Sequence, residues 1–321
     1  MMKPRFTSAL LLLGSVGITL LGSCVKENEK AERDDARYWD YNVTLNRIFY
    51  DAEGVGQQRD IFAYYLDSNR VVRHTNTHDI DETYPAISHN FRRLAFVVGD
   101  AVVHGDMRGN DRIEIPHGAF VSGTFRPGNL SWSWRSNYLT FHDRSQTPKV
   151  YFAFSDYNQE TPEAFTQGFK INGNDLVGFP TFYGEDNRIC FLRFDGSTFY
   201  LEVATAEGYD SDAETPTTVY TSSTPLSSPR VSQQQDKITF TRETASGSEV
   251  CVIDIDGENF TVISEGIGND VDPCFSPDGT QVVYASDEAG QSDLYTVNVD
   301  GSGKQNLTNT ADKNEEHPFW K

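Results

Sequence analysis

Histidine is the residue type in this chain best suited to bind a metal. Seven histidines are present: His74, His78, His89, His104, His117, His142 and His317. His74 and His78 are four residues apart, and a closing C-terminal strand would bring His317 near them. Three imidazoles with an acid would suit a divalent metal. The histidines do not share one position in the repeat described below, so we expect no metal and no other cofactor.

An acidic segment is the second place where a metal could bind. Residues 205–221 contain Asp210-x-Asp212-x-Glu214, with Glu207 before this pattern and Pro216 after it. Oxygen ligands at this spacing could hold Ca²⁺, but an EF-hand-like loop also needs a glycine and a distal glutamate. We interpret the segment as a solvated acidic loop.

The sequence motifs of common enzyme classes are missing. The chain has no Gly-x-Ser-x-Gly nucleophile elbow, no phosphate-binding loop, no Cys-x-x-Cys pair and no His-Glu-x-x-His pattern. We expect a functional site only on loops or in a central channel, because the fold predicted below uses the rest of the chain.

An internal repeat of 44 residues predicts the elements that carry these side chains. The landmarks that recur at this spacing are Pro229 and Pro273, Ile238 and Val282, Asp256-Gly257 and Asp300-Gly301, and Ile263 and Leu307. The two Asp-Gly pairs favour the turns that join antiparallel strands. Four short strands in each unit of about 40–45 residues predict blades around a channel.

Weaker copies of the repeat extend the pattern over most of the chain. A strand triplet ending in an aromatic residue begins nine residues after Pro85, Leu130 and Pro180. The first strands therefore lie near residues 85, 130, 180, 229, 273 and 318. The first strand near residue 318 has no strand after it. At the N-terminus, the run at residues 47–50 looks like the second strand of a blade. We predict an all-β, six-bladed β-propeller closed by the C-terminal strand joining the first blade. Residues 38–41 are a competing first strand for that blade.

The blade register also predicts the residues around the channel mouth. One residue stands just before each first strand, and together these are Tyr84, Asn129, Phe179, Ser228, Asp272 and His317. Such a mixture of aromatic and polar groups could orient a sugar or a peptide. The alternative is that these residues cap strands and line a water-filled channel.

The run Phe275-Ser276-Pro277-Asp278-Gly279-Thr280, which ends in Leu307-Thr308, resembles the repeat of TolB-type β-propellers. The resemblance covers residues 36–321 by period and about 90 residues by motif. Metal-dependent oligogalacturonate lyases resemble these propellers and use clustered histidines on the channel face. A metal-dependent polysaccharide lyase or glycan hydrolase is therefore the alternative to a binding function.

The N-terminal sequence predicts that the protein is located in the cell envelope. Residues 1–23 combine Lys3 and Arg5 with an apolar run at 10–21 that is short for a membrane span. The run ends in Leu21-Gly22-Ser23-Cys24, which resembles the bacterial lipoprotein processing box. This resemblance implies that Cys24 is acylated and anchors the protein in the outer membrane. Residues 24–35 read as a charged, disordered tether before a propeller at 36–321. Its Lys followed by acids is similar to the surface-export signal of some Bacteroidota lipoproteins.

Net charge restricts the possible partners, and the positions of the cysteines indicate their state. A formal charge of −20 repels nucleic acid, which we exclude as a partner. Cys190, Cys251 and Cys274 lie in strand-like runs and are expected to be free, buried thiols. We expect a non-catalytic envelope lipoprotein whose propeller binds a protein or glycan ligand at the channel mouth, facing the periplasm or the cell surface.

Overall fold

Antiparallel strands make up nearly all of the regular structure. The computed structural model describes residues 46–53, 58–77, 79–107, 111–115, 126–134, 136, 138–143, 149–154, 175–184, 188–205, 216–264 and 268–321. This part of the chain contains no helix, and so none long and apolar enough to cross a membrane. The predicted start of the propeller at residue 36 and the competing strand at 38–41 lie outside the described residues.

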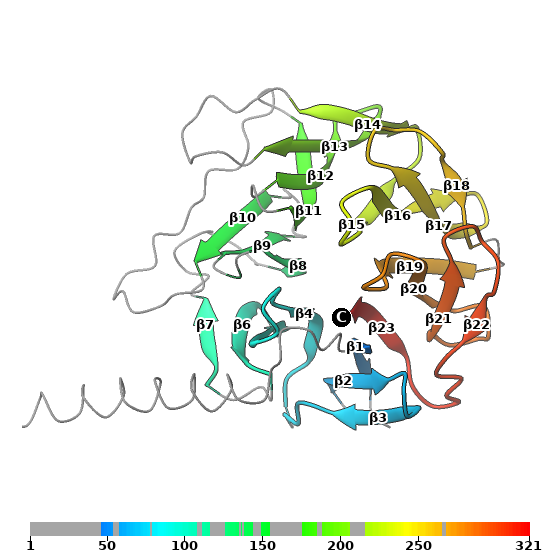
Figure 1. Cartoon of the computed structure of the whole chain (residues 1–321). Coiled ribbons are helices and arrows are strands. Elements are labelled where there is room, and N and C mark those ends of the chain that lie inside the picture. Colours follow the sequence, from blue (N-terminus) through cyan, green and yellow to red (C-terminus); the bar gives the residue numbers. More distant parts are fainter. Residues whose placement is uncertain are drawn as a thin grey trace, which may run out of the picture. The chain divides into compact units, whose positions relative to one another are not determined.

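Strand pairing groups the described strands into six blades around a central axis (Figure 1). The first blade contains β23 (Glu315–Trp320), β1 (Arg47–Glu53), β2 (Arg59–Tyr65) and β3 (Arg70–Arg73). The second contains β4 (Glu82–Ile87), β5 (Arg93–Val98), β6 (Ala101–Asp106) and β7 (Ile113–Ile115). The third contains β8 (Pro127–Trp132), β9 (Tyr138–Asp143) and β10 (Lys149–Phe154).

The remaining three blades follow in sequence order. The fourth contains β11 (Leu176–Tyr183), β12 (Arg188–Phe194), β13 (Phe199–Thr205) and β14 (Thr217–Ser222). The fifth contains β15 (Leu226–Val231), β16 (Lys237–Thr244), β17 (Gly247–Asp254) and β18 (Thr261–Val262). The sixth contains β19 (Gly268–Phe275), β20 (Gln281–Ser286), β21 (Asp293–Asn298) and β22 (Gln305–Asn306). A short parallel pairing of β17 with β19 joins the last two into one continuous sheet.

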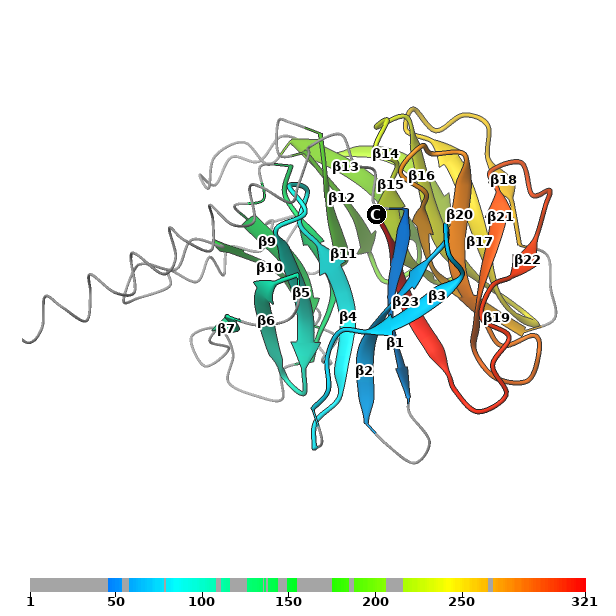
Figure 2. The same ribbon diagram turned by 60° about the horizontal axis from the view of Figure 1, so that its bottom comes forward.

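The C-terminal strand closes the first blade, as the sequence predicted. β23 pairs antiparallel with β1, with Trp320 opposite Ile48 and Phe319 opposite Phe49. Figure 2 shows the two strands side by side, and Figure 1 shows the C-terminus at the centre of the ring. The pairing leaves β1 with a partner on both sides, so the ring has no open edge at this point.

The hydrophobic core lies between neighbouring blades. Along β1, Phe49 packs in a cluster with residues of the second blade, whereas Ile48 and Tyr50 pack with residues of the sixth. This is the alternation that a strand buried on both faces produces. Cys190, Cys251 and Cys274 are free and buried within these layers, as predicted. The all-β propeller fold predicted from the repeat is confirmed.

Candidate functional site

The six residues predicted at the channel mouth lie inside the first strands, not before them. Each sits where the pairing of the first strand with the second shifts register. Their φ angles are all between 50° and 55°, in the left-handed region. Five of the six precede a proline, which fits a bulge because proline has no N–H for the ladder. The repeat thus places one left-handed residue per blade on the channel.

This ring of left-handed residues narrows the channel. Tyr84, Asn129, Ser228, Asp272 and His317 line one small cavity together with Arg230. Its volume is about 10 Å³, the size of about one water molecule. Phe179 does not line this cavity and packs against His142, with ring centroids 4.3 Å apart. The predicted ring therefore exists, but it is a constriction of the channel and not its open mouth.

Buried ionic groups hold the ring together. Asp51 of β1 is fully buried, and its Oδ1 accepts hydrogen bonds from the His317 ring (2.8 Å) and the Tyr84 backbone N–H (3.0 Å). Its Oδ2 accepts from the Arg59 Nε (2.6 Å). One carboxylate thus joins β1, β2, β4 and β23.

Asp272 extends the same network toward the fifth blade. It accepts a hydrogen bond from the Ser228 hydroxyl at 2.5 Å and lies 3.6 Å from His317 Nε2. Both nitrogens of the His317 ring therefore face carboxylates, Asp51 on one side and Asp272 on the other. Tyr84 covers the imidazole, with ring centroids 3.6 Å apart.

Electrostatics keeps this network charged. Burial alone would lower the pKa of His317, but Asp51 and Asp272 outweigh it and raise that pKa above its ordinary value. Burial likewise opposes ionisation of Asp51, yet His317 and Arg59 hold the pKa of that carboxyl below its ordinary value. The neighbouring carboxylates thus favour the protonated form of His317.

Asp51, Glu316 and His317 form a group with metal-ligand spacing within the described residues. The Arg59 guanidinium already lies against two of its members, at 2.6 Å from Asp51 and 3.1 Å from Glu316. His317 Nδ1 is also engaged with Asp51. A divalent cation would have to displace an arginine that already neutralises the site.

His74, another sequence candidate for metal binding, is not a member of this group. His74 packs on Phe49, and its Nδ1 lies 3.1 Å from the Met107 carbonyl oxygen. Neither contact involves a carboxylate or a second histidine. His78 and the acidic pattern of residues 210–214 lie outside the described residues.

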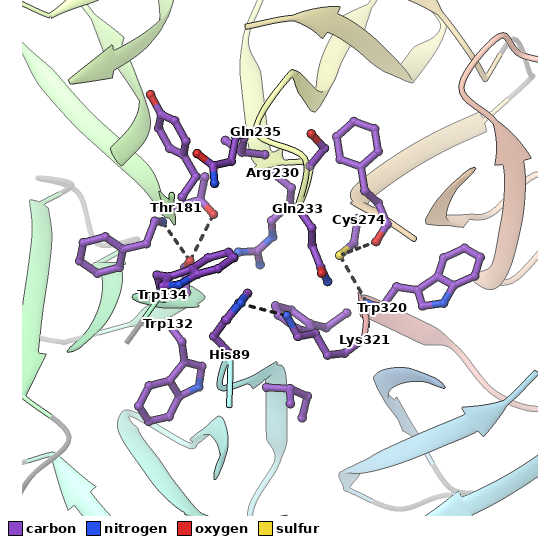
Figure 3. A pocket seen from close by; sticks show the side chains of 18 of the residues that line it. His89, Trp132, Trp134, Thr181, Arg230, Gln233, Gln235, Cys274, Trp320 and Lys321 are labelled. Atoms are coloured by element: carbon purple, nitrogen blue, oxygen red, sulfur yellow. Dashed lines mark hydrogen bonds between the residues drawn. The ribbon is translucent and has the colours of Figure 1, made fainter. Parts of the chain in front are cut away.

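A wider opening of the channel adjoins the ring (Figure 3). Its volume is about 100 Å³, and Arg230 lines both it and the small cavity. Every blade contributes to its wall: His89 from the second, Trp134 from the third, Thr181 from the fourth, Arg230 from the fifth, Cys274 from the sixth, and Lys321 after β23 of the first.

Aromatic and cationic groups define the chemistry of this opening. The imidazole of His89 stacks on Trp134 with centroids 3.7 Å apart. Burial, together with the nearby Lys321, lowers the pKa of His89 to about 4, so the ring is neutral at pH 7. Its Nδ1 lies 3.4 Å from the Lys321 Nζ and accepts from the ammonium. These groups can hold a ligand that has both a flat apolar part and polar substituents.

The comparisons with known proteins agree with the blade pattern. Residues 185–321 match the family model described as the TolB beta propeller domain. The chain has a TolB-type β-propeller fold. The matched residues contain the copies in which the 44-residue repeat is clearest.

Solved structures extend this likeness to most of the chain. TolB from Acinetobacter baumannii has 18% sequence identity and a TM-score of 0.69, covering 87% of this chain and 67% of that chain. A putative TolB from Agrobacterium tumefaciens has 13% identity and a TM-score of 0.60, covering 84% and 97%. A chain of a nidogen/laminin complex has 9% identity and a TM-score of 0.64, covering 85% and 97%. At these identities the likeness concerns the TolB-type fold alone.

The sequence patterns did not identify Asp51 and Arg59, which support the ring, and they did not identify the wider opening. One signal was present for Asp51, because an acid follows the apolar run Ile48-Phe49-Tyr50 within a strand. Nothing local marked Lys321, which is the last residue of the sequence and reaches the channel only through closure of the first blade.

Proposed function

We propose that this TolB-type propeller is a non-catalytic envelope lipoprotein that binds a protein or glycan ligand in its channel. The wider opening around Trp134 and Lys321 receives the ligand. The ring of Tyr84, Asn129, Phe179, Ser228, Asp272 and His317 forms the base of the binding site. Arg230 connects the two, because it lines both.

The observation that carries this proposal is the convergence of all six blades on one opening of mixed chemistry. Its wall combines indole and phenyl rings with amide, hydroxyl and cationic groups. Ligand sites combine apolar walls with a few placed polar groups in this way. The chain of the nidogen/laminin complex adds support, because a propeller of similar fold occurs there in a complex of two proteins.

The described geometry supports binding over catalysis. A general base or a metal ligand needs a free pair of electrons directed at a substrate. In the ring, the oxygens of Asp51 and the nitrogens of His317 already face one another, Arg59 or Asp272. We therefore place the metal-dependent lyase or hydrolase second to the binding function.

The ligand can be sought with a glycan array and with a pull-down from envelope extracts. We expect Trp134→Ala to weaken capture of the ligand about tenfold or more, since a central aromatic wall is lost. Phe260→Ala is the matched control, because Phe260 is 37% exposed and stacks on Tyr220 of β14, away from the opening. Equal losses in the two variants, or a ligand mapped to the outer strands, would contradict a channel site.

The proposed anchor is the acyl chain on Cys24. It rests on the Leu21-Gly22-Ser23-Cys24 box directly after the apolar run. Replacing Cys24 by Ala should abolish labelling with a radioactive fatty acid and release the protein from the outer-membrane fraction. Retention of both label and membrane association in this variant would show that the anchor lies elsewhere.

A further inference from the structure

The charged side chains that line the wider channel opening are cationic, although the protein is strongly acidic. The chain has a formal charge of −20, yet the residues that line this opening include Arg230 and Lys321 and no aspartate or glutamate. This statement covers the described residues. The charged side chains that line the opening are therefore opposite in sign to the whole molecule, and cationic side chains in a cleft attract anions.

Both cations lack a carboxylate partner within the described residues. Lys321 is 6% exposed, and within the described residues its ammonium contacts the His89 ring and the face of Phe91. The guanidinium of Arg230 donates to the Leu130 carbonyl oxygen at 3.0 Å and lies over the Phe319 ring at 5.8 Å. Neither forms a direct ion pair with a described residue, although Asp272, which lines the small cavity together with Arg230, attracts its guanidinium.

Two other shielded arginines of this chain show the contrast. The side chain of Arg59 is 11% exposed and is paired with Asp51, Glu53 and Glu316. Arg193 is 15% exposed and is paired with Asp175 and Glu202. A buried charge is costly unless a partner neutralises it. An anionic ligand in this pocket would supply the counter-charge for the lysine and the arginine that face it.

The rest of the wall indicates an anion with an organic body. Trp134 presents an indole supported by His89 (Figure 3). Gln233 extends toward the centre of the same pocket, where its amide can donate and accept (Figure 3). A simple inorganic ion would leave these groups unused.

We propose that the wider opening binds an organic carboxylate, whose charged oxygens contact Lys321 and Arg230 and whose body packs on Trp134. This inference rests on the proposed channel-binding function and specifies the chemistry of its ligand. Charge-assisted hydrogen bonds from ammonium and guanidinium to carboxylate are the strong contacts available here.

The test uses small carboxylates and their neutral analogues at constant ionic strength. D-glucuronate and N-acetylglycine are the two carboxylates, and D-glucose and N-acetylglycinamide are the neutral analogues. Tryptophan fluorescence and the melting temperature are followed as each probe is titrated. We expect at least one carboxylate to quench fluorescence saturably and raise the melting temperature, with no response to its neutral analogue. The responding carboxylate shows whether the natural source is an acidic sugar or an acyl-amino acid terminus.

The variants Lys321→Met and Arg230→Gln test the assignment of the two cations. Loss of one charge-assisted contact should weaken carboxylate binding about tenfold or more. Lys321→Met keeps the length and apolar stem of the side chain and removes a buried charge, so its fold should be retained. Lys304→Met is the matched control, because Lys304 pairs with Glu288 near the outer strands of the sixth blade.

Two results would overturn the carboxylate assignment. One is an equal response to the carboxylates and to their neutral analogues, or a response to both carboxylates that is no larger than the response to chloride. The other is unchanged carboxylate affinity in both Lys321→Met and Arg230→Gln. If capture of a neutral glycan or a protein still depends on Trp134, the channel-binding function stands and only this inference fails.

Discussion

At the scale of single residues, Asp51 connects four strands of the first two blades, although the repeat pattern did not single it out. Its carboxylate is fully buried and contacts groups from three other strands, including His317, which lies 266 residues away. Such a buried group is satisfied only while all of its partners stay in place. The closing strand is therefore held by an ionic contact as well as by the β-ladder.

Replacing Asp51 by Asn should lower the free energy of unfolding by about 3–5 kcal/mol, because it removes the carboxylate nearest to both Arg59 and His317. Urea denaturation of the variant and the wild type at pH 7 measures this difference. Glu243→Gln is the control, since Glu243 is exposed and should change the free energy of unfolding by less than about 0.5 kcal/mol. Similar unfolding midpoints for Asp51→Asn and the wild type would contradict a structural role for the carboxylate.

Glu315 makes a pH-dependent contribution next to the same strand. It is 1% exposed and accepts hydrogen bonds from the hydroxyls of Thr310 (2.8 Å) and Thr308 (3.2 Å). Burial raises the pKa of Glu315 from 4.5 to about 7. Because the folded pKa lies above the unfolded one, its contribution to stability is complete below pH 4.5 and is lost as the pH rises through about 7.

Glu315→Gln should remove the loss of stability that accompanies ionisation of Glu315. The variant is expected to become more stable than the wild type as the pH rises from 5 to 8, by about 3 kcal/mol at pH 8. Thermal melts of both proteins across this range give the comparison. The pH dependence of His317 is common to both proteins and cancels in the difference. A stability difference that does not change with pH would show that Glu315 is ionised throughout.

At the scale of elements, the first strand of each blade combines pairing with a sharp local turn. A residue with a Cβ atom in the left-handed region costs about 1–2 kcal/mol. The same cost recurs once per blade, at six residues with nearly equal φ angles. The repeated strain is offset by pairing with the second strands and by packing between blades, so it can persist in every repeat.

Asn129 offers a direct test of this backbone strain. Its φ is 55° and its side chain is 3% exposed, with an Nδ2 that has no hydrogen-bond partner among the described residues. Asn129→Gly should be neutral or slightly stabilising, whereas Asn129→Val should cost at least about 1–2 kcal/mol. Thr217→Val, at an exposed position of β14 that is not left-handed, is the control and should be nearly neutral. If the Gly and Val variants of Asn129 unfold at the same urea concentration, the left-handed conformation is not a source of strain.

At the scale of the whole molecule, closure depends on the last six residues. They pair with β1, place Trp320 in the core between the first and sixth blades, and bring Lys321 to the channel. A propeller without this strand exposes the edge of β1 to other chains. Stability and the channel site are therefore coupled through one segment.

Deleting residues 316–321 should lower the melting temperature strongly and cause association. Trp320→Ala removes one buried side chain and should account for about 3–5 kcal/mol of the loss. Differential scanning fluorimetry and size-exclusion chromatography of the two variants report stability and association separately. An unchanged melting temperature and a monomeric elution profile after the deletion would refute closure as the main lock of the ring.

The sequence alone determined the blade architecture, because its signals are local and repeated. Alternating apolar residues, Asp-Gly turns and a recurring proline each report on a few neighbouring positions. Six copies of such signals predict six blades and name the six residues of the ring, but they predicted neither the left-handed backbone of these residues nor their place inside the strands. The same logic predicted the pairing of Trp320 with the N-terminal strands, since an unpaired strand remained at each end of the chain.

Only the tertiary structure decided the width of the channel and which charged side chains face it. The distance between Asp51 and His317 depends on closure of the whole ring, and no local pattern encodes a contact across 266 residues. The ring could be either an open mouth or a constriction, and side-chain packing made it a cavity of about 10 Å³. Arg230 and Lys321 face the same opening because blades far apart in sequence meet at the axis. Volumes and charges summed over distant side chains are properties of the folded molecule, and no single repeat contains them.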